Sequence, residues 1–399
     1  MIKSNKKAIA FASVAFCGLF AFLSFGSLPN IAANAIDNEY DIVSEKECEI
    51  AANKWLVQNY DDDTVIDEII PVMTGEKITS YCVNFTCNGE PNGYIIIDSD
   101  KESRNFIPEF SLSGKGIYET LSESAEISNT FATSKKVIYS VGNLDYAIPI
   151  NREGSVLYSS SNETITKSAL KHMDEQIAAK KPSFVNERTE AEKKIYYDGF
   201  FSETDMSFNS LKKLCNIDGA NSFKPSLMSE LRVEGGFSGN CTPTAATNLF
   251  SLHVEERWGM GEFFTRQEIY NSIVSFGKWN QFGELGMTLS SAIKGMKSTA
   301  RSIFFHSLVS ISLSSDGWDK WEESIVENIP ILTAVWGLKN NNGSWEEVGH
   351  AIVGIGYRVY DDGACYLRVL DGWYPSNERY IWFNSDYFTD KEGYSIIIL

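Results

Sequence analysis

The C-terminal end of the sequence holds a series of short β-branched and aromatic segments, which constrain the fold more than any other feature. Five such segments follow one another, at residues 330–337, 350–360, 365–373, 379–384 and 394–399. Val, Ile, Tyr and Phe favour strands because their side chains pack well on a pleated surface. One apolar helical segment precedes them. An order of helix first and strands last predicts an α+β fold, with this helix packed on an antiparallel sheet.

The helical segment, residues 241–259, has clear start and stop signals. Pro243 suits the first turn, where its missing N–H costs no hydrogen bond, and Gly259 follows the last apolar position. We therefore expect Cys241 at the helix N-terminus, where free N–H groups and the helix dipole favour a thiolate. The thiolate is the nucleophilic form of cysteine, so this position could serve catalysis. An inert buried cysteine is the alternative.

A thiol nucleophile needs a base, and the chain has four histidines. His350 begins the apolar segment 350–360, and a sheet that faces the helix would bring its imidazole to Cys241. Asp371 ends the next strand, 21 residues after His350. A hairpin would place its carboxylate beside the imidazole, where a carboxylate orients the ring. A core histidine and a turn aspartate are the ordinary structural explanations, but the ordered set of three is more specific than each part.

These segments resemble papain-like cysteine peptidases, most closely the streptopain type and its bacteriocin-processing relatives. GNCTPTAATNL at 239–249 is similar to their nucleophile helix, and GHAIVGIGY at 349–357 is similar to their histidine strand. GMTLSSAIKGM at 286–296 resembles a segment that lies between the two in these relatives. The resemblance implies a papain-like catalytic fold and cleavage of peptide bonds.

The resemblance also assigns roles to single residues. VLDGW at 369–373 stands where papain-like enzymes have Asn-Ser-Trp, so Asp371 matches the residue that orients His350, and Trp373 the residue that shields it. Cys241 would attack the peptide carbonyl. His350 would hold the thiolate as an ion pair and protonate the leaving amine. No cofactor and no metal is implied.

The sequence departs from the family pattern at the oxyanion site. The family carries a Gln six residues before the nucleophile, whose side chain donates to the oxyanion, and Gly235 stands at that position. Asn240 and Ser238 are the candidate replacements, and the N–H of Cys241 is the other expected donor. Losing one oxyanion donor typically costs ~10²–10³ in rate. A weakened or inactive homologue that acts as a binding protein is therefore an alternative function.

A transglutaminase-like acyl transferase is a further alternative, because such enzymes also use Cys, His and Asp. Cys241 and His350 are 109 residues apart, a spacing that suits papain-like chains and is long for the transferases.

The remaining segments suggest further units. Residues 1–35 have three Lys, an apolar run and an Ala-Asn-Ala end, the pattern of a signal peptide cleaved after Ala35; an uncleaved membrane anchor is the alternative. Residues 36–115 form an α+β unit that resembles streptopain-type inhibitory prodomains. We expect 116–200 to be a linker and the rest of the pro-region, and 201–399 to be the catalytic domain. The prediction is thus a secreted cysteine endopeptidase made as a zymogen, or a cell-surface anchored one.

Charge and cysteine content limit the partners. The net charge of −18 argues against nucleic acid, because phosphate contacts need clustered Lys and Arg. The expected partners are a protein or peptide substrate and the chain's own pro-region, and a membrane only if the N-terminal segment stays uncleaved. Six cysteines follow that segment, and their 15 possible connectivities leave any disulfide pairing open: Cys48, Cys82, Cys87, Cys215, Cys241 and Cys365.

Overall fold

The computed structural model describes most of the chain after its N-terminal segment. The described residues are 42–60, 63–125, 136–142, 144–161, 163–170, 189–203, 209–231, 239–278, 286–313, 317–341, 344–384, 388 and 390–399. By their contacts they belong to one unit. The predicted signal peptide, Gly235 and Ser238 lie outside these residues.

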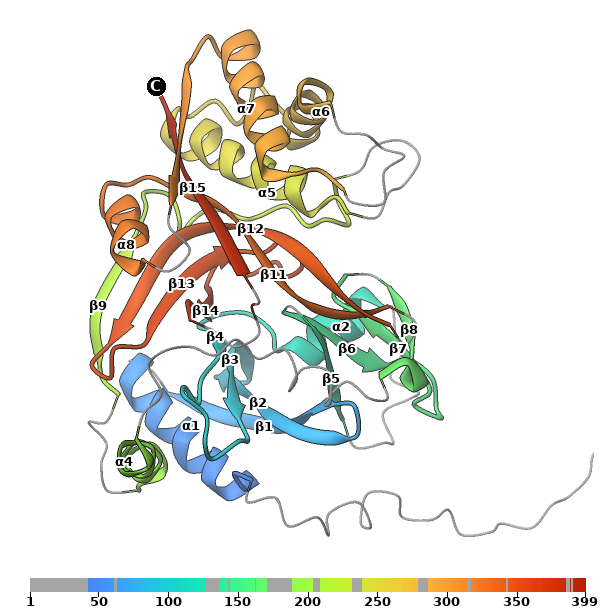
Figure 1. The fold of residues 1–399 in the computed structure, drawn as a ribbon, viewed down its shortest axis with the longest axis vertical. Helices are drawn as coiled ribbons and strands as arrows, with labels where there is room; N and C mark the ends of the chain where they lie inside the picture. Colours follow the sequence, from blue (N-terminus) through green and yellow to red (C-terminus); the bar gives the residue numbers. More distant parts are fainter. Residues whose placement is uncertain are drawn as a thin grey trace, which may run out of the picture. The chain divides into compact units, whose positions relative to one another are not determined.

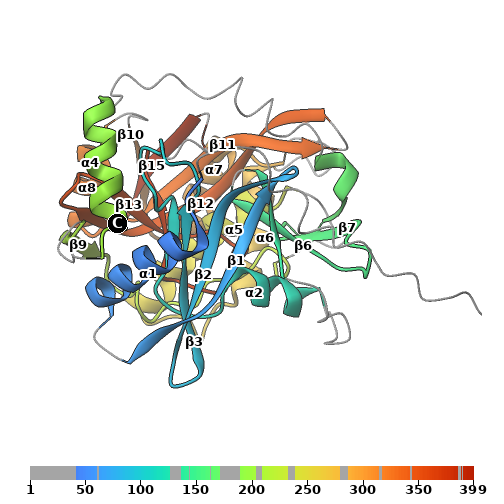
Figure 2. The same cartoon turned by 90° about the horizontal axis from the view of Figure 1, so that it is seen from below.

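The first elements are one helix and a strand meander. Helix α1 (Glu45–Asn59) is followed by β1 (Thr64–Thr74), β2 (Lys77–Cys87), β3 (Glu90–Asp98) and the short β4 (Glu109–Ser111). A capping box begins α1: the Ser44 hydroxyl accepts from the Glu47 N–H at 3.3 Å, and the Glu47 carboxylate accepts from the Ser44 N–H at 2.6 Å. Figure 2 shows α1 against β1 and β2, which it contacts.

The next segment contains more strands than its sequence predicted. After helix α2 (Ile117–Ser124) come β5 (Ile138–Gly142), β6 (Asp145–Pro149), β7 (Val156–Ser159) and β8 (Thr164–Thr166), a 3₁₀ turn (Lys167–Leu170) and helix α4 (Glu190–Phe201). The sequence predicted a linker here. β7 (Val-Leu-Tyr-Ser) and β8 (Thr-Ile-Thr) are so short that their own residues give only a weak strand signal. Their partners along the chain supply the hydrogen bonds that make them strands.

The C-terminal elements include all five predicted strands. β9 (Leu211–Asn216) comes first, and helices α5 (Cys241–Leu252), α6 (Arg266–Gly277) and α7 (Leu289–Ile303) follow, with a π-helical turn (His253–Arg257) directly after α5. Then come β10 (Leu308–Leu313), α8 (Trp318–Val326), β11 (Ile331–Asn341), β12 (Ser344–Tyr360), β13 (Cys365–Leu370), β14 (Arg379–Trp382) and β15 (Asp390–Ile398). Gly259 has φ +63° and lies just beyond the helical stretch, as expected for a stop signal.

The described strands join into one sheet with helices packed on it (Figure 1). Its order is β10-β15-β11-β12-β13-β14-β4-β3-β2-β1-β5-β6-β7-β8, and β9 pairs with β12. The pairs are antiparallel except β1 with β5. Helix α5 contacts β11 and β12, and α6 and α7 pack beside it. The mixed fold with a mainly antiparallel sheet agrees with the predicted class.

The N-terminal and C-terminal parts share a core as well as a sheet. β4 pairs with β14, with Phe110 opposite Tyr380. The ring of Phe110 stacks on Tyr380 at 4.8 Å and meets Tyr366 at 5.1 Å and Trp55 at 4.5 Å. All four side chains are buried. The two parts therefore gain stability from the same aromatic cluster.

This shared core leads to a stability prediction. We expect Phe110→Ala to lower the free energy of unfolding by about 3–5 kcal/mol, because it deletes a fully buried ring. Phe305→Ala is the matched control: its ring is 90% exposed, so the change should stay within about 0.5 kcal/mol. Urea unfolding followed by both fluorescence and circular dichroism measures the difference. Two separate transitions in the unmodified protein would contradict a shared core.

Candidate functional site

Cys241 is the first residue of α5, as the sequence predicted. Residues 242–252 of this helix are all buried, whereas Cys241 is half-buried. The first N–H groups of a helix have no partner within it and point beyond its end. All six described cysteines are free thiols. The site therefore offers a thiol at the positive end of a helix that is fixed on every side.

Asn240 does not have the role that the sequence suggested. Its amide nitrogen donates to the carbonyl oxygens of Met228 at 2.8 Å and Leu231 at 2.9 Å. An amide group has two N–H donors, so both are used and neither is directed to an oxyanion. The side chain instead holds the start of α5 against the preceding segment. Ser238, the other candidate, lies outside the described residues, which leaves the N–H of Cys241.

His350 lies within a strand and not at its start. β12 begins at Ser344, and Val335 of β11 is the partner opposite His350. The sequence placed the strand start at His350 because the apolar run begins there. The polar residues before it are also paired with β11, so the strand extends further back. His350 is 3% exposed, which makes it a core position of the sheet.

Two contacts fix the imidazole of His350. Its Nε2 lies 2.9 Å from the carbonyl oxygen of Asp371. A carbonyl can only accept, so Nε2 carries the proton and Nδ1 keeps a lone pair. The ring of Trp373 stacks on the imidazole with centroids 3.7 Å apart and planes inclined by 7°. The ring is thus held in one tautomer and covered on one face.

The carboxylate of Asp371 has a different role from the predicted one. Its Oδ1 accepts from the N–H groups of Trp373 at 2.7 Å and Tyr374 at 2.9 Å, and its Oδ2 binds Arg379. An aspartate before a glycine readily caps the turn that follows it, and Gly372 has φ +76°. The carboxylate therefore shapes the turn, and the carbonyl of the same residue orients the histidine.

This turn also connects His350 with the start of α5. The carbonyl of Gly372 accepts from the Met228 N–H at 2.8 Å, and the carbonyl of Met228 accepts from Asn240. A Cβ at Gly372 would lie 3.4 Å from the Thr244 side chain, in the first turns of α5. Hydrogen bonds thus run from the residue before Cys241 to the turn that holds His350.

Burial sets the charge state of the histidine. It lowers the pKa of His350 to about 4, because desolvation disfavours the cation; Asp371 opposes this shift and Arg379 adds to it. At pH 7 the imidazole is therefore neutral and available as a base. The sequence predicted a thiolate–imidazolium ion pair, which this environment does not favour.

Two further residues of the site, Arg379 and Glu109, were not predicted from the sequence. Arg379 is 1% exposed, and its Nη2 donates to both carboxylate oxygens of Glu109 at 2.9 Å, while Nη1 binds Asp371. The guanidinium also lies over the Tyr374 ring, 4.7 Å from its centroid. The only signals in the sequence were two charged residues beside strand-forming segments, which are common at a protein surface.

The turn between β5 and β6 lies beside this cluster. Leu144 has φ +67°, and its carbonyl oxygen is 3.4 Å from Arg379 Nη2. It belongs to the apolar cluster of α5, against which Cys241 and Trp373 also pack. The charge of Asp145 acts on His350 and raises its pKa, against the larger effect of burial. A segment outside the predicted catalytic region therefore reaches the candidate site.

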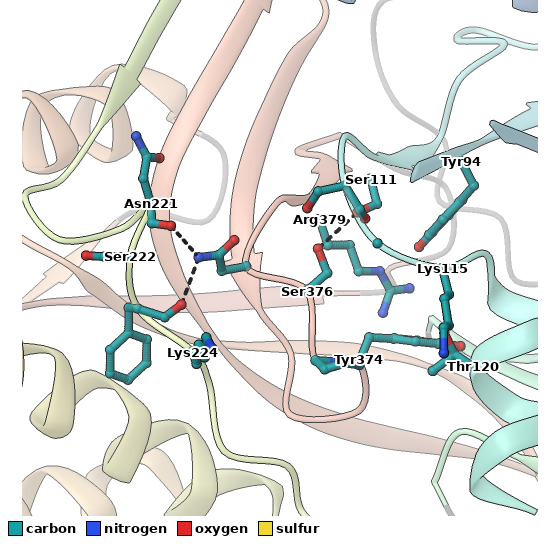
Figure 3. Close-up of a pocket in the computed structure, with 15 residues that line it drawn as sticks. Tyr94, Ser111, Lys115, Thr120, Asn221, Ser222, Lys224, Tyr374, Ser376 and Arg379 are labelled. Carbon is teal, nitrogen blue, oxygen red and sulfur yellow. Dashed lines mark hydrogen bonds between the residues drawn. The ribbon is translucent and has the colours of Figure 1, made fainter. Parts of the chain in front are cut away.

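A pocket of about 330 Å³ lies beside Arg379 and Tyr374 (Figure 3). Its lining comes from three separate parts of the chain: Tyr94, Ser111, Ser113, Gly114, Lys115, Thr120, then Asn221, Ser222, Phe223, Lys224, and then Tyr374, Pro375, Ser376, Asn377 and Arg379. Cys241 and His350 are not among these residues. Within the described ranges, no cluster of His, Cys, Asp and Glu could hold a metal ion.

Comparison with known proteins adds little to this geometry. No protein-family model and no curated protein matches the chain. The solved structure of UfSP from C. elegans, a cysteine protease of the papain-like fold, matches with a TM-score of 0.31 and 11% identity. The match covers 48% of this chain and 35% of UfSP. A likeness at this TM-score carries no weight for fold or activity.

None of the described helices is both long enough and apolar enough to cross a bilayer.

Because two histidines are buried in the neutral form, we expect the folded protein to lose stability in acid. The folded-state pKa is about 4 for His350 and, through burial and the nearby Arg257, about 3 for His253. Below pH ~6.5 the unfolded chain binds protons that the folded chain does not. The free energy of unfolding should therefore fall between pH 6.5 and 4, by up to about 1.4 kcal/mol per pH unit for each histidine.

Urea unfolding at pH 7 and pH 5 tests this prediction. Between the two pH values, the free energy of unfolding should fall less in His350→Gln than in the unmodified chain, by on the order of 1–2 kcal/mol. His306→Gln is the matched control, because His306 is half-buried, bonds the carbonyl of the C-terminal Leu399 through Nδ1 and stacks on Trp258. An equal pH dependence in His350→Gln and the unmodified chain would contradict the assignment.

Proposed function

We propose that this chain is a cysteine peptidase in which Cys241 is the nucleophile and His350 the base. One observation carries the proposal: a half-buried thiol at a helix N-terminus is linked by hydrogen bonds to the turn that orients a buried, neutral histidine. A nucleophile, a base and a group that orients the base are what acyl transfer by a thiol requires.

The proposed reaction follows from the tautomer of His350. Nδ1 takes the proton from the thiol of Cys241, and the thiolate attacks the carbonyl carbon of the peptide bond. The N–H of Cys241 stabilises the oxyanion, and Nδ1–H then protonates the leaving amine. The acyl group leaves when water, deprotonated by the same nitrogen, attacks the thioester. The carbonyl of Asp371 stabilises the imidazolium through Nε2–H in each step.

We also propose that the N-terminal part is a pro-region of a secreted zymogen. The contact of the Leu144 turn with Arg379, and the charge of Asp145 near His350, support a segment that covers the site. The boundaries at 115 and 200, the signal peptide and export are part of this proposal. Activation would then have to separate β4 from β14, since these two strands join the N-terminal and C-terminal parts of the sheet.

A binding protein with the same fold is the second candidate function. It is favoured by the oxyanion site, where Gly235 has no side chain and both N–H groups of Asn240 are used. A Cys241 thiol that does not react with alkylating agents in the folded protein would indicate this function. A transglutaminase-like acyl transferase would be revealed by incorporation of an added amine.

Self-cleavage is the first test of the peptidase. The purified full chain is incubated in reducing buffer, and its intact mass is followed over time beside Cys241→Ala and, as a matched control, Cys365→Ala. We expect trimming between residues 116 and 230 in the unmodified chain and in Cys365→Ala, and none in Cys241→Ala. Removal of the attacking thiol eliminates the covalent step, so the rate should fall by at least about 10³-fold.

The opposite results separate the alternatives. Equal trimming in Cys241→Ala would mean that another protease or another residue cuts the chain. No trimming in any variant, together with no hydrolysis of a denatured protein substrate, would overturn the peptidase in favour of the binding protein.

A further inference from the structure

We propose that Arg379 is a positioning residue for His350 and that Glu109, from the N-terminal part, holds Arg379 in place. The inference rests on the proposed function for its catalytic meaning, although the geometry that it describes can be tested without activity. It makes the orientation of the base depend on a residue 270 positions from Arg379 along the chain.

The first step is the balance of charge in a closed site. Arg379, Glu109 and Asp371 are 1%, 1% and 3% exposed, and one guanidinium serves both carboxylates. A buried ion without a partner costs several kcal/mol. Removing any one of the three charges therefore forces the other two to rearrange.

The second step concerns how the hydrogen bonds of the Arg379 guanidinium are shared between the carboxylates of Glu109 and Asp371. Glu109 accepts from Nε at 3.2 Å and from Nη2 through both oxygens at 2.9 Å, so it holds the guanidinium in a fork. Asp371 accepts from Nη1 alone. The hydroxyls of Tyr94, at 2.7 Å, and Tyr146, at 3.0 Å, fix Glu109. Glu109 thus decides where the guanidinium lies.

The third step leads from Asp371 to the base. With Oδ2 bound to Arg379, Oδ1 faces the N–H groups of Trp373 and Tyr374. These bonds shape the turn that presents the Asp371 carbonyl to Nε2 of His350 and the Trp373 ring to its face. Arg379 reaches the histidine through Asp371, to which its Nη1 donates.

The pairing of β4 with β14 keeps Glu109 next to Arg379. β4 carries Glu109 and β14 begins with Arg379, and the two strands pair with Ser111 opposite Arg379. Loss of β4 would remove the carboxylate that forms three of the contacts of Arg379. Release of the N-terminal part would therefore change the orientation of His350 as well as uncover it.

The test uses the tautomer of His350, which a merely structural role would not change. The full chain is labelled with ¹⁵N-histidine, and the His350 signals are assigned by their loss in His350→Gln. At pH 7 the ring nitrogens of the unmodified protein should report the Nε2–H form. In Glu109→Gln and Arg379→Lys we expect the Nδ1–H form to rise about five- to thirtyfold, the factor that one or two net hydrogen bonds are worth.

Matched variants control for a general loss of stability. Glu255→Gln breaks another two-pronged pair, with Arg266 at 2.7 Å for both bonds, and should leave the tautomer unchanged. Glu109→Asp keeps the negative charge, so most of the His350 side chain should stay in the Nε2–H form in this variant. If Glu109→Gln and Arg379→Lys do not fold by circular dichroism, Tyr94→Phe replaces them, since it removes only a hydroxyl donated to Glu109.

The outcomes are distinct. An unchanged tautomer in the folded variants overturns the inference, whatever the activity. A changed tautomer supports it even in a protein without peptidase activity, in which case only the proposed function fails. Where the unmodified chain hydrolyses peptides, Arg379→Lys should lower kcat about tenfold with little change in KM, and an effect on KM alone would contradict a positioning role.

Discussion

The burial of the Arg379 charge is the interaction on which the rest of the structure depends. A guanidinium with 1% exposure needs compensation from groups that are equally buried, and Glu109 and Asp371 provide it from two distant parts of the sequence. Desolvating three charges is favourable only if all their hydrogen bonds are made. The sheet pairing of β4 with β14 and the aromatic contacts of Phe110 bring these groups together. Electrostatics and packing thus require the same association of the two ends of the chain.

The same burial keeps the candidate base weak. Desolvation is the largest cause of the lowered pKa of His350, and the nearby charges largely oppose one another. A cover over such a site inhibits in two ways, because it blocks access and also removes the water that would stabilise an imidazolium. If the Leu144 turn leaves, water reaches the ring and the pKa of His350 rises toward the range of an effective base. Uncovering the site would by itself strengthen the base.

Local signals in the sequence predicted the elements well, and non-local contacts decided what it could not predict. The start of α5 at Cys241, its stop before Gly259 and the five C-terminal strands depend on neighbouring residues. The sequence also placed His350 and Asp371 together correctly. It assigned the contact to the Asp371 carboxylate, whereas the carbonyl makes it, because a distant arginine and a local turn compete for that carboxylate.

Other differences have the same origin. The strands β5 to β8 have only three to five residues each, so their own sequences give a weak signal and their pairing partners stabilise them. Asn240 directly precedes Cys241 and was therefore a candidate oxyanion donor, but the carbonyls of residues 228 and 231 take both its N–H groups. Such competition is decided in three dimensions, and spacing along the chain does not reveal it.

The choice between a peptidase and a binding protein depends on which features of the site lower the stability of the fold without being needed for binding. A binding protein would have no need of a buried imidazole with one fixed tautomer, a stacked indole and a carbonyl aimed at Nε2. Burying such a group lowers stability at acid pH, and a Phe or Leu at the same sheet position would avoid that cost. The oxyanion site favours the binding protein, since Gly235 supplies no side chain and carbonyl oxygens take both N–H groups of Asn240. Under the proposed function, a site with an oriented base and fewer oxyanion donors than expected corresponds to a slow peptidase, because a missing donor lowers the rate by ~10²–10³ and leaves the reaction itself intact.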